Sequence, residues 1–207
     1  MKIVKPKQTI TALVEDQIVK IEEVESHTHY KKCQITSNFG IKKINEVIFE
    51  NCTFDRLDFK QMEFLDVIFD NCNLASGDFS EGLIYRSEFK NCQLSGANFI
   101  DSKQKNVKWQ GCLLSYANYS SSNMERVHFI EGRMTESYFQ DCQLKNVIFE
   151  EIDANGVDLV GSKLTGLDIS KAHFDFLNLD ISLAKGLKIG YDQAYKLITL
   201  SGIEIVE

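Results

Sequence analysis

Cysteine is the residue type in this chain that most invites a chemical interpretation, because four of its six copies recur at one interval. Cys52, Cys72, Cys92 and Cys112 lie 20 residues apart. Thiolates bind structural zinc, but zinc requires a tetrahedral set of ligands and evenly spaced residues offer a line. No CxxC pair accompanies the cysteines. The spacing therefore favours free thiols that fill a core in a reducing compartment.

Other chemistry-bearing residues are scattered rather than grouped. His27 and His29 flank Thr28, but no further ligands lie near them, so we expect no metal there. Two of the four histidines, His128 and His173, fall at positions that should face solvent. No nucleophile elbow, P-loop or zinc motif occurs in the sequence. We therefore expect a protein without catalytic residues, metal or cofactor.

Apolar residues recur with a period of five, and this repeat determines where the residues above lie. Every fifth residue from Phe39 to Ile189 is apolar, with Gln104 as the exception. A helix repeats at 3.6 residues and a strand at 2, so a period of five requires a chain that turns a corner each time. Because the cysteines repeat every fourth unit, four units form one coil. The pattern predicts a four-sided all-β solenoid with coils about 4.8 Å apart.

A second inward position lies two residues before each large one and usually holds a small or β-branched residue, such as Cys52 or Val67. Alternating large and small side chains fill a narrow tube, so we expect no interior cavity for a substrate. An inward glutamine is costly unless it is hydrogen-bonded. At Gln104 the sequence therefore predicts a local bulge or a relaxed coil, and a functional role there stays open.

The repeat divides the chain into three parts. Residues 1–38 lack the register and are expected to form an N-terminal cap with an irregular first coil; residues 39–189 form the solenoid. Residues 190–207 carry an N-cap candidate, Asp192, then apolar residues at helical spacing, then Ser201 and Gly202 as a stop before a short strand. We expect a short helix and a strand at this end.

Charge is distributed unevenly over the predicted walls. The wall of Phe59, Phe79 and Phe99, here called the acidic wall, carries Asp58, Asp78, Glu81, Asp101, Asp141, Asp158 and Asp180. The wall of Phe64 and Ile84, here called the basic wall, carries Lys43, Arg86, Lys103, Lys105, Arg126, Lys145, Lys163 and Lys185. The partner of the basic wall stays open. The acidic residues either bind a partner or only form hydrogen bonds in the turns.

Units such as CTFDR, GDFSE and CQLSG resemble the pentapeptide-repeat consensus. The resemblance implies a right-handed quadrilateral β-helix. The segment from GLDISKAHF to the end is similar to the C-terminal part of Qnr-type quinolone-resistance proteins, above all the Gram-positive chromosomal members. The unbroken register leaves no room for the loops that interrupt the repeat in many Gram-negative Qnr proteins.

This resemblance implies a homodimer that imitates DNA, binds DNA gyrase and topoisomerase IV, and protects them from fluoroquinolones. The implied dimer interface consists of Ala194, Leu197, Ile198, Leu200, Ile203 and Ile205. Two alternatives stay open: the helix only caps its own chain, or the protein is a scaffold with a target unrelated to topoisomerases.

The composition favours a cytoplasmic protein. The net charge of −7 argues against direct binding to nucleic acid. The sequence contains no run of about 18 apolar residues that would predict a membrane span. Its first residues lack the apolar core of a signal peptide.

Overall fold

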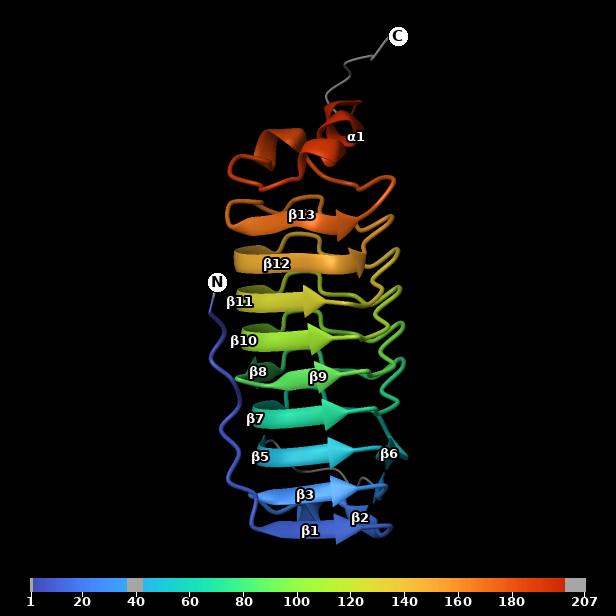
Figure 1. Ribbon diagram of the computed structural model, residues 1–207. Coiled ribbons are helices and arrows are strands. Elements are labelled where there is room, and N and C mark those ends of the chain that lie inside the picture. Colours follow the sequence, from blue (N-terminus) through green and yellow to red (C-terminus); the bar gives the residue numbers. More distant parts are fainter. Residues whose placement is uncertain (1, 37–42, 200–207) are drawn as a thin grey trace.

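The computed structural model describes residues 2–36 and 43–199 and shows a rod of stacked coils (Figure 1). Strands on the near face all run in one direction while the chain climbs from β1 to β13, so the solenoid is right-handed. Every strand pair within the described ranges is parallel. The predicted fold class is confirmed.

The elements are short because each coil is divided by corners. The long sheet contains β1 (Ala12–Glu15), β3 (Thr28–Lys31), β5 (Lys43–Glu50), β7 (Glu63–Asp70), β8 (Leu83–Tyr85), β9 (Glu88–Lys90), β10 (Lys103–Gln110), β11 (Asn123–Ile130), β12 (Gln143–Asp153) and β13 (Leu167–His173). A smaller sheet contains β2 (Ile18–Lys20), β4 (Gln34–Thr36) and β6 (Thr53–Phe54). The helical segments are η1 (Ile21–Glu23), η2 (Ile181–Leu183), η3 (Tyr191–Gln193) and α1 (Ala194–Ile198).

The register of the sheet reproduces the interval of 20 residues. Phe49 pairs with Phe69, and Phe69 with Phe89, on successive coils. The first turns of the chain are shorter: Ala12 pairs with Thr28, and Thr28 with Val47, intervals of 16 and 19 residues. Phe39, at the start of the period-five series, lies outside the described residues. The N-terminal segment thus contributes coils to the same sheet with an interval of its own.

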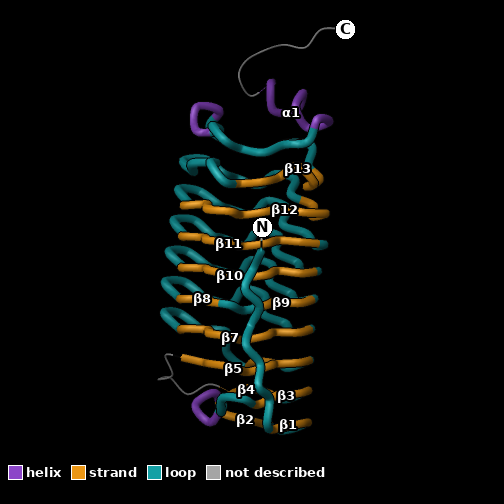
Figure 2. The backbone as a smooth tube through the Cα atoms, turned by 60° about the vertical axis from the view of Figure 1, so that its left-hand side comes forward, coloured by secondary structure: helices purple, strands orange, loops and turns teal. Residues whose placement is uncertain are grey.

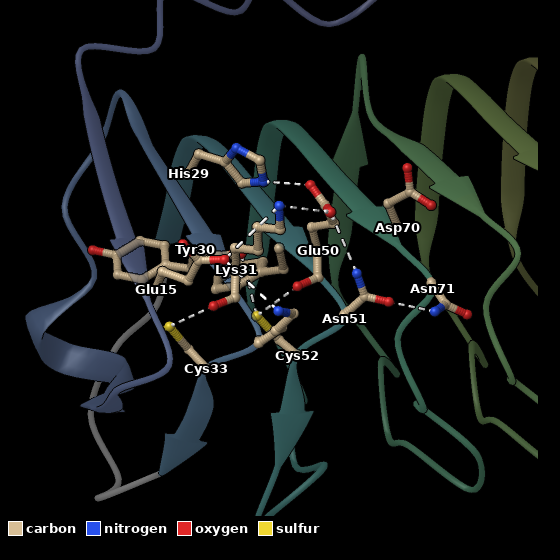
Figure 3. A network of polar contacts seen from close by, with 12 residues as sticks. Glu15, His29, Tyr30, Lys31, Cys33, Glu50, Asn51, Cys52, Asp70 and Asn71 are labelled. Atoms are coloured by element: carbon tan, nitrogen blue, oxygen red, sulfur yellow. Dashed lines mark hydrogen bonds and ion pairs between the residues drawn. The ribbon is translucent and has the colours of Figure 1, made fainter.

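A polar network joins these shorter coils to the regular ones (Figure 3). His29 Nε2 lies 2.9 Å from Glu50 Oε2, and Lys31 Nζ lies 3.8 Å from carboxylate oxygens of both Glu15 and Glu50. The Asn51 amide donates to Glu50 Oε1 at 3.3 Å. Contacts between neighbouring coils thus begin at the first turns.

The chain turns its corners at residues with a left-handed backbone conformation. The residue two places after each large apolar residue has a positive φ at most corners, as at Asn51, Asn71 and Asn91 with 54°, 52° and 52°. Asparagine and aspartate tolerate this region because their short polar side chains bond locally, and glycine has no Cβ to clash. Gly111 follows in the same column with φ 66°. The corner requirement therefore selects some of the polar residues on the surface.

Stacked aromatic rings fill the tube. The Phe99 ring lies parallel to those of Phe79 and Tyr119, with centroid distances of 4.9 and 4.6 Å. The Trp109 ring meets Phe99 edge-on at 5.3 Å and stacks on Phe89 at 4.0 Å. All five side chains are buried. The walls are held together by ring contacts both along and across the rod.

The cysteines are core residues, as predicted. All six are free and buried. The thiols of Cys72, Cys92 and Cys112 each lie 3.4–3.5 Å from a carbonyl oxygen of the coil before, to which they donate. Burial raises the pKa of the Cys52 thiol to about 11. The Cys52 thiol therefore stays protonated at neutral pH, and the six buried cysteines act as small packing groups.

The prediction of a bulge at Gln104 is wrong. Gln104 is 1% exposed and pairs in register with Ile84 on one side and Met124 on the other. Its Nε2 donates to Ser102 Oγ at 3.3 Å, so the tube supplies a partner for the amide nitrogen, whereas Oε1 is buried without a partner among the described residues. The irregularity occurs instead between β12 and β13, where the register shifts after Ile148 and again after Glu150.

An axial arm is the feature that the sequence analysis did not predict. Residues 2–11 precede β1, which lies at the lower end of the rod. They extend along the outside of the rod between β1 and the level of β10 and β11 (Figure 2). Ile3 and Pro6 are half-buried, whereas Lys2, Lys5 and Lys7 are exposed. The single proline therefore lies outside the coils, where no ladder hydrogen bond is lost.

Candidate interaction surfaces

The acidic wall consists of three adjacent columns of residues rather than one row. Asp58 bridges to Asp78, and Asp158 follows three coils after Asn98, in line with Asn118 and Tyr138. Glu81, Asp101 and Asp141 lie in the neighbouring corner column, each with φ between 54° and 57°. Asp180 belongs to a third column. The structure thus places the predicted residues along one side, with a gap in the first column.

Asp58, Asp78 and Asp158 stabilise the turns that follow them. Their Oδ1 atoms accept hydrogen bonds from the backbone N–H two residues on, at 3.3, 3.0 and 3.0 Å. Asp180 Oδ2 accepts from the Gly161 N–H at 2.7 Å. This geometry supports the structural role for four of the seven residues.

The corner carboxylates are more available. Glu81 accepts from Gln61 Nε2 at 2.6 Å and lies 2.9 Å from Lys60 Nζ, and these contacts lower its pKa. Asp101 and Asp141 are exposed. In the described part of the chain, no side-chain hydrogen bond or ion pair forms at either of them. These two carboxylates are therefore free to meet a partner.

Two tyrosines on the same side were missed from the sequence. Tyr138 stands in the Asp58 column and is 41% exposed, and Tyr116 occupies the corner that leads into this wall and is 61% exposed. Tyrosine is enriched at protein interfaces because it combines apolar area with a polar tip. An aromatic residue at an outward repeat position was the signal that could have identified them.

Part of the basic wall is engaged within the rod. Arg86 forms two hydrogen bonds with the Asp66 carboxylate at 2.8 and 2.6 Å, and Arg126 Nε donates to Asn106 Oδ1 at 2.8 Å. Lys105 Nζ lies 2.9 Å from Glu125. The remaining members of the wall are exposed lysines: Lys43, Lys103, Lys145, Lys163 and Lys185. The arginines therefore act within the fold, and the lysines provide the outward charge.

The C-terminal segment covers the end of the rod. Gln193 is buried, and its Nε2 donates to the carbonyl oxygens of Ile169 and Ala172 at 2.9 and 2.8 Å. Lys196 Nζ donates to the carbonyl oxygen of Phe174. Asp192 makes no capping bond, because η3 runs directly into α1 and leaves no free helix start there. Unpaired carbonyls of the last coil are thus satisfied by side chains of this segment.

An apolar hollow lies beside α1. It measures about 390 Å³ and is lined by Leu179, Ile181, Ala184, Leu187, Ile189, Ala194, Leu197 and Ile198. Leu197 is 6% exposed and belongs to the core of its own chain, whereas Ile181 and Ile198 are 47% and 41% exposed. Leu200, Ile203 and Ile205 lie outside the described residues. Ile181 and Ile198 thus leave apolar surface open beside a core residue at this end of the rod.

Neither a metal cluster nor a membrane-spanning helix is found among the residues that the structure describes. Histidine, cysteine, aspartate and glutamate form no group of three that could hold an ion there. The helices in this part of the chain are too short to cross a bilayer.

A four-sided right-handed solenoid turned every five residues, with one large inward side chain per unit, defines a class of quadrilateral β-helices. The pentapeptide repeat region model matches residues 42–119 and 62–137, and the pentapeptide repeats (8 copies) model matches residues 137–175. The chain belongs to the pentapeptide-repeat family.

Solved structures of several family members resemble the rod. A trypsin-treated variant of QnrB1, a plasmid-mediated fluoroquinolone resistance protein, matches with a TM-score of 0.50 and 21% identity over 95% of this chain and 99% of that one. HetL, involved in heterocyst differentiation regulation in the cyanobacterium Nostoc sp. strain PCC 7120, matches with a TM-score of 0.31 and 15% identity over 90% and 86%. None of the curated proteins compared with the sequence matches it. The chain therefore has the fold of Qnr-type pentapeptide-repeat proteins.

Proposed function

We propose that this protein binds DNA gyrase and topoisomerase IV in the cytoplasm by imitating DNA, and that it protects both enzymes from fluoroquinolones. The observation that carries the proposal is the pair of exposed carboxylates, Asp101 and Asp141, on one side of a straight rod. They lie two coils apart, about 9.6 Å along the axis. The similarity of the C-terminal sequence to Qnr-type proteins supports the same function.

The imitation is partial in charge. Duplex DNA carries one charge per about 1.7 Å, or about three for every coil of about 4.8 Å. The acidic wall offers about one carboxylate per coil on average, and several of these are engaged in turns. The proposed recognition therefore combines the shape of the rod with a few free carboxylates and the exposed rings of Tyr116 and Tyr138.

A supercoiling assay tests the proposal. Gyrase inhibited by ciprofloxacin should regain supercoiling activity as this protein is added at low molar ratios, because the rod competes with DNA for the site where the drug acts. Relaxation and cleavage by topoisomerase IV should respond in the same way. Unchanged inhibition of both enzymes would refute the proposal and favour the second candidate, a scaffold with another target, which the turn bonds of Asp58, Asp78 and Asp158 support.

A second copy of the chain is the proposed occupant of the apolar hollow beside α1. The resemblance implies a dimer formed by this end, and the hollow leaves Ile181 and Ile198 half-exposed next to a core residue, Leu197. Self-association would cover this surface and double the length of the rod. The capping bonds of Gln193 belong to each chain by itself, so capping and dimerisation are compatible.

Ile181→Asp is expected to convert the dimer to monomer. A carboxylate buried in an apolar interface without a partner weakens association by several kcal/mol, about 100-fold or more in the dissociation constant. Light scattering coupled to gel filtration at micromolar concentration measures the change. Val160→Asp is the matched control, because Val160 is 42% exposed on the rod away from the hollow. A variant that stays dimeric would contradict the assignment of this interface.

A further inference from the structure

The axial arm lies along one corner of the rod, over a row of polar residues between the basic wall and the wall of Phe69 and Phe89. This row, here called the corner groove, consists of successive left-handed corner residues: Asp66, Arg86, Asn106 and Arg126. The Lys7 N–H donates to Asp66 Oδ1 at 2.8 Å, and the Val4 N–H points to Asn106 Oδ1 at 3.4 Å. Gln8 Nε2 donates to the Asp66 carbonyl oxygen at 2.6 Å.

The spacing of the groove matches an extended chain. Asp66 and Asn106 are two coils apart, about 9.6 Å at the strand separation of a sheet. Val4 and Lys7 are three residues apart, about 10 Å in an extended backbone. Each acceptor therefore meets one backbone N–H of the arm without distortion of either partner.

The corner groove is organised on its own side. Arg86 holds the Asp66 carboxylate in a bidentate pair, and Arg126 holds the Asn106 amide oxygen. Both acceptors are 1% exposed beneath the arm. Arginine restrains the orientation of each acceptor, so the remaining lone pairs point toward the peptide backbone that lies over them.

Recognition depends mainly on the backbone of the arm. Its lysines, Lys2, Lys5 and Lys7, are exposed. Two of its three hydrogen bonds to the corner come from backbone N–H groups, and the third comes from the Gln8 side chain. Backbone recognition of an extended peptide is independent of most side chains, as in strand addition to a sheet edge. The same segment of a second copy, in the same conformation, would meet the same acceptors.

We propose that the corner groove is a binding site for an extended peptide segment, and that residues 2–10 occupy it in cis. A partner's peptide enters when the arm leaves. The partner is a second copy of this chain, whose residues 2–10 carry the sequence that already occupies the site. This site lies at the corner diagonal to Tyr116 and does not depend on the proposed topoisomerase function.

Lys7→Pro in the full-length chain tests the proposal. Proline removes the N–H group that donates a hydrogen bond to Asp66, and the substitution lies outside the coils of the rod. Lys5→Pro is the matched control: it removes the same charge, and no hydrogen bond of the Lys5 N–H occurs within the described chain. NMR hydrogen exchange reports on the Val4 amide. We expect at least tenfold faster exchange in Lys7→Pro than in the wild type, and little change in Lys5→Pro.

Binding in trans is measured by the fluorescence anisotropy of a labelled synthetic peptide with the sequence of residues 2–11. Lys7→Pro should bind it at least tenfold more tightly than the wild type or Lys5→Pro, whose own arms compete. Adding Asn106→Gly to Lys7→Pro should weaken binding while the left-handed corner is kept. A freely exchanging Val4 amide in the wild type, or no binding of the peptide to Lys7→Pro, would overturn the proposal.

Discussion

Asp101→Asn combined with Asp141→Asn should raise the concentration of protein needed for half-maximal rescue of gyrase by about tenfold or more. The two carboxylates are exposed and free of intramolecular partners in the described structure, so their full charge is available to a topoisomerase. A tenfold change corresponds to about 1.4 kcal/mol, a modest loss for two charges in one interface. Asparagine tolerates the left-handed backbone of both corners, so the rod should remain folded.

The corner diagonally opposite that of Asp101 and Asp141 offers a matched control. Glu131 and Glu151 are also left-handed corner residues one coil apart, with φ of 55° and 49°. Glu131→Asn with Glu151→Asn removes the same number of charges from the opposite edge of the rod. The supercoiling assay with ciprofloxacin should register little change for this control. Equal losses from both pairs would mean that net charge, and not the acidic wall, governs rescue.

Phe99→Ala is expected to lower the free energy of unfolding by about 3–5 kcal/mol. Phe99 is fully buried and stacks on Phe79 and Tyr119, so truncation leaves a cavity that the flanking rings cannot fill. Because the total stability of a domain is about 5–15 kcal/mol, this loss is a large share of it. Urea unfolding followed by circular dichroism gives the value.

Phe176→Ala controls for the loss of a ring as such. Phe176 is 48% exposed, so its truncation should change the unfolding free energy by less than about 1 kcal/mol. If Phe99→Ala proved as mild as Phe176→Ala, the stacked rings would contribute little to stability, and the backbone ladder would be the main source.

The period of five was sufficient to predict the coils because inward residues and corners recur together. Large residues such as Phe99 and small ones such as Cys92 mark the same tube from inside. The pair Asp66 and Arg86 was also within reach of the sequence, since residues 20 apart stack on neighbouring coils. It was missed because the charges of the basic wall were considered without their partners one coil away.

The arm could not be predicted from residue types. Its recognition uses the backbone N–H groups of Val4 and Lys7, which every residue other than proline carries. The internal partner of Gln104 was equally hidden, because Ser102 looks like one small filler among many. Gln193 gave no signal either, as its carbonyl partners in the last coil are defined only by the fold.

The position of the arm also determines the order in which the rod can be completed during synthesis. Val4 is made 102 residues before its partner Asn106, an interval of about 5–20 s at typical rates of translation. A solenoid otherwise needs only its preceding coil in order to grow. Here Lys7 and Gln8 can meet Asp66 once β7 has emerged, whereas Val4 must wait for the sixth coil of the sheet, at β10. Nascent chains that end before β7 therefore present Lys2, Lys5 and Lys7 without a coil beneath them to whatever surrounds the ribosome exit.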